Sequence, residues 1–354
     1  MPPATDLEAR FPDMPAVLHV HAISWAKWGL LRQCFPGRRL VRVRNTHALP
    51  PCAWLVAWGM SPIPAGLSSA ARVLRLEDGF LRSVGLGVDL VRPLSWVVDG
   101  QGMHFDSSRP SDLETILATR AIDARRLARA ADLRARIVSK QLTKYNVGSR
   151  RWRRPAGRAR VILVPGQVPT DAAVSFGAVG PACNMSLLRA VRDANPGAYL
   201  VYKVHPDIVA GMRIQRETAS DARQWCDELV TDVDMAALLT AVDEVHVMTS
   251  LSGFEALLRA KPVTCYGRPF YSGWGLTRDM NPANGRRQRR LTLDELVAGA
   301  LIEYPVYLSR DGQGLITPEA ALDALSDWRS KREVGNDWWR GAYRGALRRL
   351  VGVR

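Results

Sequence analysis

The chain has 354 residues, with 49 Lys and Arg against 34 Asp and Glu and a formal net charge of +15. Its 47% hydrophobic content is enough for a full core and excludes a generally disordered protein. No stretch approaches the roughly 20 apolar residues that a membrane span needs, and the first residues lack the basic and apolar regions of a secretory signal. Five cysteines without paired spacing predict neither a disulfide framework nor a zinc site, so we expect a cytoplasmic protein.

The first part of the chain alternates between short apolar segments and amphipathic ones. The expected strands are 16–20, 41–43, 53–57, 73–76 and 94–98, and the expected helices are 21–31, 111–117 and 121–144. Ser111 and Glu114 predict a capping box at the start of one helix. An Arg-, Pro- and Gly-rich stretch around 148–158 is the best candidate for a linker.

A second module follows this linker. Its expected strands are 161–164, 199–204, 244–248 and 263–266, and its expected helices are 185–195, 234–242, 252–260 and 317–325. Strands and helices of these lengths in alternation predict parallel, doubly wound α/β sheets. We therefore divide the chain into an α/β domain over 1–150, a second α/β domain over 159–315, and a basic helical tail over 316–354.

The basic residues are mostly arginines and are unevenly spread. They gather at 150–160, at 286–290 and in the tail from Trp328 onward, where tryptophans lie among them. The excess of positive charge allows nucleic acid, an anionic membrane surface or an acidic substrate as a partner. The tail fits a lipid headgroup interface, and it fits equally a helix that packs its tryptophans on the body of the protein.

Polar residues follow four of the predicted strands, at the edge where open α/β sheets bind ligands. A serine-rich helix start favours an anion site, because N–H groups, hydroxyls and the helix dipole converge there; plain N-capping is the alternative. A histidine before Pro-Asp can bond a phosphate or a sugar hydroxyl. Together these segments predict one half of a nucleotide-sugar site. Its candidate residues are Glu77, Asp78, Arg82, Gln167, Asp171, Lys203, His205, Pro206, Ser250, Ser252, Gly253 and Glu255.

Several of these segments are similar to the capsule polysaccharide β-Kdo transferases of Gram-negative bacteria. The matching segments are LEDGFLRSVGLG (76–87), residues 89–114, LVPGQVPTDA (163–172), YKVHPD (202–207) and residues 245–277. The resemblance implies two Rossmann-like domains in a GT-B-like glycosyltransferase, with the acceptor on the side of the first domain and the CMP-sugar in the second. Related enzymes often carry two transferase modules in tandem, and this chain has room for one.

The resemblance also implies a reaction and roles for the candidate residues. The reaction is transfer of β-Kdo from CMP-β-Kdo with retention, with Asp171 as the catalytic carboxylate in the loop of Gln167. His205, Pro206 and the helix start at 250–255 are implied to bind CMP. Thr170 stands where we expected an acidic residue. Two further roles are argued from the residues themselves: Glu77 or Asp78 would orient or deprotonate the acceptor, and Arg82, close to the EDG turn, would neutralise the Kdo carboxylate.

We expect no metal and no cofactor, since the residues above can stabilise the departing phosphate themselves. The expected acceptor is an anionic glycan or glycolipid, with the tail in peripheral contact with the inner face of the cytoplasmic membrane and no nucleic acid bound. Three alternatives stay open at this point. They are a sialyltransferase-like enzyme that uses another CMP-nonulosonate, a non-catalytic polysaccharide assembly or export partner, and a nucleic-acid-binding protein suggested by the basic composition.

Overall fold

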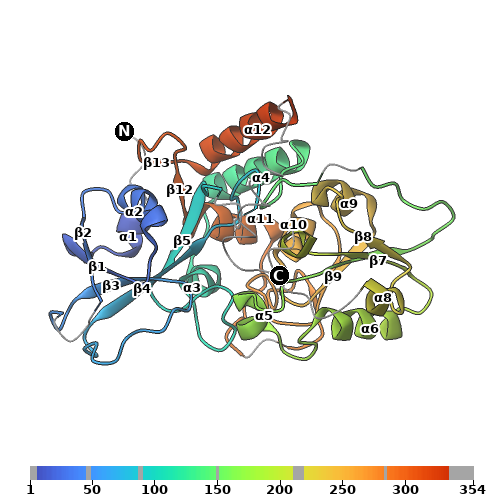
Figure 1. Ribbon diagram of the computed structural model, residues 1–354, viewed down its shortest axis with the longest axis horizontal. Helices are drawn as coiled ribbons and strands as arrows, with labels where there is room; N and C mark the ends of the chain where they lie inside the picture. Colours follow the sequence, from blue (N-terminus) through green and yellow to red (C-terminus); the bar gives the residue numbers. More distant parts are fainter. Residues whose placement is uncertain are drawn as a thin grey trace, which may run out of the picture.

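The structure is a computed structural model that describes residues 6–44, 49–86, 91–148, 151–209, 219–282 and 285–334. Two α/β units lie side by side, each built around its own sheet, and helices from late in the chain lie against the first unit (Figure 1). The predicted class of two Rossmann-like α/β units is confirmed. The tail beyond 334 lies outside the described residues.

The first sheet has seven strands in the order β13-β12-β5-β4-β3-β1-β2. Strands β1 to β4 are parallel to one another. Strand β5 runs antiparallel to β4, β12 runs antiparallel to β5, and β13 runs antiparallel to β12. Their bounds are β1 Val17–His21, β2 Arg39–Arg42, β3 Trp54–Trp58, β4 Arg72–Asp78, β5 Ser95–Asp99, β12 Pro305–Leu308 and β13 Leu315–Ile316.

The second sheet has six parallel strands in the order β11-β10-β9-β6-β7-β8. Their bounds are β6 Val161–Pro165, β7 Tyr199–Lys203, β8 Glu228–Val230, β9 Glu244–Val247, β10 Val263–Cys265 and β11 Arg278–Asp279. Counted within the unit, this is the doubly wound order 3-2-1-4-5-6 of dinucleotide-binding folds. The strand order reverses between β6 and β9, and ligands of such sheets bind outside this point.

The helices cover the sheets and join the two units. Their bounds are α1 Asp6–Arg10, α2 Trp28–Cys34, α3 Asp112–Thr119, α4 Ala124–Ser139, α5 Ala172–Gly177, α6 Asn184–Ala194, α7 Pro206–Val209, α8 Ala219–Arg223, α9 Met235–Ala241, α10 Leu251–Leu258, α11 Leu293–Val297 and α12 Pro318–Val334. A 3₁₀ turn, η1, spans Trp25–Lys27, and a π-helical turn, η3, spans Ala298–Glu303. One continuous apolar cluster contains buried residues of both units, from Leu113 and Ile137 to Leu257 and Leu325.

Three of the differences from the sequence predictions concern helix bounds and the division into units. The helix predicted over 21–31 runs over Trp28–Cys34, because His21 still belongs to β1. The helix predicted over 121–144 ends at Ser139, and Gln141 follows with a φ of 52°. The predicted second domain, 159–315, included β12, yet β12 pairs with β5 of the first sheet, so the chain crosses back to its first unit. The division into domains otherwise stays a prediction.

Candidate active site

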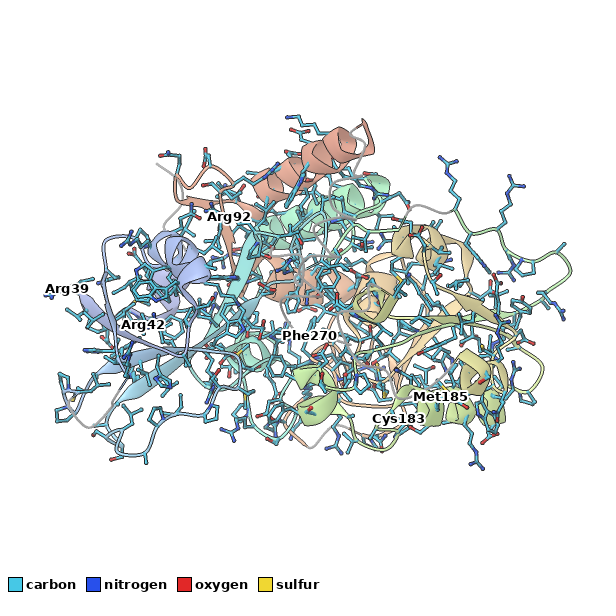
Figure 2. All side chains as sticks on the ribbon, in the orientation of Figure 1. Arg39, Arg42, Arg92, Cys183, Met185 and Phe270 are labelled. Carbon is cyan, nitrogen blue, oxygen red and sulfur yellow. The ribbon has the colours of Figure 1, made fainter. Side chains whose placement is uncertain are left out.

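A cavity of about 430 Å³ lies outside the carboxyl ends of the strands of both sheets. On the side of the second unit it is lined by the loops that follow β6, β7 and β9, at and beside the switch point of that sheet. On the other side it is lined by residues at the ends of β3 and β4. Phe270 forms part of its wall and is labelled near the middle of Figure 2, between the two units. Ten of the twelve predicted site residues line this cavity: Glu77, Asp78, Gln167, Asp171, Lys203, His205, Pro206, Ser250, Ser252 and Glu255.

Hydrogen bonds of Gln167 connect the loop after β6 with the loop after β9 at the switch point. Its side-chain oxygen accepts a hydrogen bond from the backbone N–H of Thr249 at 3.0 Å, and its amide nitrogen donates to the Thr249 hydroxyl at 3.1 Å. Its backbone is held by the Asn184 side chain, which both accepts from the N–H and donates to the carbonyl. Gln167 is 5% exposed, so it fixes the shape of the cavity floor rather than offering a free reactive group.

Asp171 is the N-cap of α5 and stands exposed at the cavity. One carboxylate oxygen accepts a hydrogen bond from the backbone N–H of Ala173 at 3.0 Å. The capping role that the sequence suggested is therefore present, and it orients the side chain without consuming both of its oxygens. Asp171 is also among the negative charges that act on Lys144 across the cavity.

The end of β7 carries a lysine and a histidine. Burial lowers the pKa of Lys203 to about 8, and its ammonium donates to the Thr231 carbonyl at 3.0 Å. Nδ1 of His205 accepts from the backbone N–H of Asp207 at 3.2 Å. The neutral ring therefore carries its proton on Nε2, which makes that nitrogen the donor of the imidazole.

The start of α10 follows β9. Ser250 is the N-cap and accepts from the Ser252 N–H, so the capping alternative is met, and both serines also line the cavity. Gly253 does not line it; a Cβ at this position would collide with the Tyr271 hydroxyl, so the glycine is required by packing. Glu255 lines the cavity, but one of its oxygens accepts from the backbone N–H of Lys144 at 2.7 Å, which ties α10 to the segment that joins the two units.

The EDG turn at the end of β4 supplies two carboxylates in different surroundings. Asp78 forms an ion pair with Arg82 at 2.6 Å. Arg82 is 5% exposed and also donates to Ser83, so it supports Asp78 and does not line the cavity. Burial raises the pKa of Glu77 to about 7, and the negative charge of Asp78 adds to this.

Lys144 is the main cavity residue that the sequence analysis did not select. It lies in the 143–147 segment, where its backbone carbonyl accepts from Ser83 N–H and its N–H donates to Glu255. Burial lowers the pKa of Lys144, but Tyr145 and the acids Asp78, Asp171 and Glu77 outweigh burial and raise it. The ammonium is therefore a cation at neutral pH, placed among the carboxylates. The sequence carries one weak signal for this position: the chain has only six lysines, and Lys144 is one of them.

An aromatic wall closes the cavity on the side of the first unit. Phe80 stacks on Phe270 at 4.7 Å, and the His104 ring meets both edge-on. Burial lowers the pKa of His104 to about 3, with a smaller contribution from Lys144. His104 is thus neutral and serves as part of a wall against which an apolar face of a ligand can pack.

Neither a metal site nor a membrane span emerges from the described ranges. Within them, no group of three or more His, Cys, Asp or Glu side chains is arranged to hold a metal ion. No helix in that part of the chain is both long and apolar enough to cross a bilayer.

A ligand cavity at the switch point of one Rossmann-like unit, completed by a second such unit, defines a protein of the GT-B-like class. A family model for "Capsule polysaccharide biosynthesis protein" matches the chain at residues 65–154 and 123–307. The chain belongs to this family, and the recognition made from the sequence motifs is confirmed.

Curated relatives agree with this membership. The capsule polysaccharide modification protein LipA of Neisseria meningitidis serogroup B is 44% identical over 278 residues, which is 78% of this chain and 39% of LipA. The lipopolysaccharide-processing protein LpsZ of Rhizobium meliloti is 44% identical over 260 residues, 71% of this chain and 59% of LpsZ. The chain thus spans about two fifths of the length of LipA.

Two solved structures share the fold. Both are from KpsC of Thermosulfurimonas dismutans. The β-Kdo 2,7 transferase is 35% identical, with a TM-score of 0.74 over 88% of this chain and 98% of that one. The β-Kdo 2,4 transferase is 28% identical, with a TM-score of 0.74 over 87% of this chain and 98% of that one.

Proposed function

We propose that the protein is a retaining glycosyltransferase that moves β-Kdo from CMP-β-Kdo to an anionic glycan or glycolipid acceptor in surface polysaccharide synthesis. The observation that carries the proposal is the convergence of a phosphate-binding half and an acidic half on one cavity between the two units. The similarity to two Kdo transferase structures of KpsC supports the donor and the reaction class.

The half from the second unit would bind CMP. Nε2 of His205 and the N-terminus of α10 at Ser250 and Ser252 offer donors to the phosphate. Lys203 adds a positive charge at the same strand edge. These groups would stabilise the charge that develops on the departing phosphate, so we propose that the reaction needs neither a metal nor another cofactor.

Asp171 would act as the nucleophile. Its carboxylate attacks C2 of Kdo, the bond from C2 to the phosphate oxygen breaks, and CMP leaves with the electron pair. Oxocarbenium-like charge at C2 is stabilised by the same carboxylate. Lys144 is placed to neutralise the carboxylate of the sugar, the role first expected of Arg82, which is held by Asp78 instead.

The half from the first unit would serve the acceptor. The acceptor oxygen attacks C2 from the face that CMP left, the bond to Asp171 breaks, and the acceptor proton passes to Glu77. Two inversions at C2 give net retention. A general base works best with a pKa near the operating pH, which favours Glu77, whose pKa is about 7, over the ion-paired Asp78.

The Asp171→Asn variant tests this proposal. It should lose transfer by at least a thousandfold while CMP still binds with nearly unchanged affinity, because the amide keeps the cap of α5 but cannot form the covalent adduct. The measurements are CMP release with purified protein, a CMP-Kdo generating system and defined acceptors, and calorimetry with CMP. Asp193→Asn, on the exposed face of α6, is the matched control.

Transfer at near wild-type rate in Asp171→Asn would remove the assigned nucleophile. The same assay with other CMP-nonulosonates separates a sialyltransferase-like enzyme from a Kdo transferase, and wild-type protein that binds CMP without turnover would indicate an assembly or export partner. EDTA should leave the rate unchanged; loss of activity in EDTA, restored by a divalent cation, would overturn the metal-free mechanism.

A further inference from the structure

A row of aromatic and basic side chains runs along the carboxyl edge of the first sheet toward the cavity. It consists of Arg42, Trp25, Lys27 and Trp58, here called the Trp25 row. The Arg42 guanidinium lies 4.5 Å from the ring centroid of Trp25, and the Lys27 ammonium lies 2.8 Å from that of Trp58. Trp58 itself lines the cavity beside Glu77. The row is therefore continuous with the proposed acceptor half of the site.

The topology of the sheet puts these residues in line. The parallel strands stand in the order β2-β1-β3-β4. Arg42 ends β2, η1 with Trp25 and Lys27 follows β1, Trp58 ends β3, and Glu77 lies at the end of β4. The strand order reverses between β1 and β3, so η1 and Trp58 meet at the switch point of this sheet, where doubly wound sheets bind ligands.

The end of the row that lies away from the cavity is exposed to solvent. Trp25 is 67% exposed, against 38–46% for Phe176, Val209 and Met280, the other exposed large hydrophobic residues in the part of the chain that the structure describes. The ring packs on Trp28 with centroids 5.2 Å apart, and Arg42 covers it from another side. An aromatic ring held in place yet exposed is what a sugar ring needs for stacking.

We propose that the Trp25 row is an extended acceptor subsite that binds an anionic oligosaccharide, with a sugar ring on Trp25 and sugar carboxylates at Arg42 and Lys27. The proposal rests on the proposed function. It places the growing end of the acceptor at Glu77 and the earlier sugars along the strand ends of β3, β1 and β2. A line of residues that leads into a cavity fits a chain-shaped ligand, and the alternation of rings and cations fits a carboxylated one.

The test compares a single-sugar acceptor with a carboxylated oligosaccharide that ends in the same sugar. Wild-type protein should have a higher kcat/KM for the longer acceptor. In Trp25→Ala and in Arg42→Ala this advantage should shrink about fivefold, through the KM of the longer acceptor, since one aromatic or cationic contact contributes about 1 kcal/mol. Trp25→Phe should restore most of it, and an oligosaccharide with its carboxylates converted to amides should lose it in the wild type.

Arg189→Ala is the matched control, because Arg189 lies over Trp225 on the second unit in a comparable pair. An unchanged advantage in both Trp25→Ala and Arg42→Ala would overturn the proposal, as would a fall that Arg189→Ala shares. A fall confined to acceptors presented on vesicles would assign the row to a membrane surface instead. If the wild type transfers to no acceptor, the proposed function fails, and calorimetric binding of the same oligosaccharide to wild type and Trp25→Ala still decides the subsite.

Discussion

Glu77 and Asp78 are neighbours in the chain, yet their surroundings give them different chemistry. Asp78 has a fixed partner in Arg82 at 2.6 Å. Glu77 accepts only from the backbone N–H of Asp78 among the hydrogen bonds of the described residues, and burial raises its pKa to about 7. From the sequence, either carboxylate could be the base that deprotonates the acceptor, and their environments favour Glu77.

The pH dependence of transfer should report these groups. A general base must be deprotonated, so kcat/KM should rise with pH and reach half of its limiting value near pH 7, the pKa of Glu77. Above about pH 8 the rate should fall again, because Lys203, whose pKa is lowered to about 8, loses its charge. Initial rates between pH 5 and 9 measure this bell-shaped dependence of kcat/KM on pH.

Glu77→Gln should abolish the acid limb of that profile along with most of the activity, whereas Asp78→Asn should lower the rate and keep the limb. An acid limb that persists at the same pH in the residual activity of Glu77→Gln would assign the base to another residue.

At the scale of elements, the arginine cluster at 286–290 holds the two units together. Glu114 of α3 forms ion pairs with Arg286 at 2.5 Å and with Arg287 at 3.0 Å. Arg287 also donates to the carbonyls of Pro269 and Ser272. Ser111 caps α3 as expected, but the predicted capping box is incomplete, because the Glu114 side chain is taken by these arginines.

Glu114→Ala should destabilise the protein by about 3–5 kcal/mol, because it leaves Arg287, which is 9% exposed, buried without its carboxylate. Asp323→Ala is the control: Asp323 pairs with Arg136 at an exposed site on α12, and its loss should cost less than about 1 kcal/mol. Urea unfolding followed by circular dichroism measures both, and equal effects of the two variants would contradict this account.

Helix α4 uses its arginines in the same way. Arg129 pairs with Glu319 of α12 at 2.7 Å, and Arg134 pairs with Asp294 of α11 at 2.9 Å. Trp328 packs against the core, with Arg310 over its ring at 4.2 Å. Trp328, the first tryptophan of the predicted tail, is thus a packing residue. The membrane contact predicted for the tail from Trp328 onward stays a prediction, and 335–354 lie outside the described residues.

At the scale of the whole molecule, the two units share one apolar cluster, and the cavity takes residues from both. They should therefore unfold in one cooperative transition. CMP at a hundred times its Kd should stabilise the native state by about 2.7 kcal/mol and raise the Tm of that single transition. Differential scanning calorimetry with and without CMP measures this; two transitions, of which CMP moves one, would show that the units fold independently.

The structure shows where the basic side chains behind the net charge of +15 lie and which carboxylates they pair with. Many arginines that could attract nucleic acid are paired with carboxylates of the same chain, as at Arg154 with Asp243 on the surface and Arg329 with Asp234. The lysines divide differently: Lys144 and Lys203 line the cavity, and Lys27 stacks on Trp58 at its edge. Among the described residues, no arginine lines the cavity beside Lys144 and Lys203.

The sequence by itself determined the α/β class, most strand positions and ten of the cavity residues, because apolar periodicity and polar strand ends are local patterns that survive without knowledge of partners. Tertiary structure alone decided the rest. It returned β12 to the first sheet, and it brought Lys144 and Trp58, the inner end of the Trp25 row, to the cavity beside Glu77. These outcomes depend on contacts between segments far apart in the chain, and side-chain pairing across such distances leaves no periodic signal in one sequence.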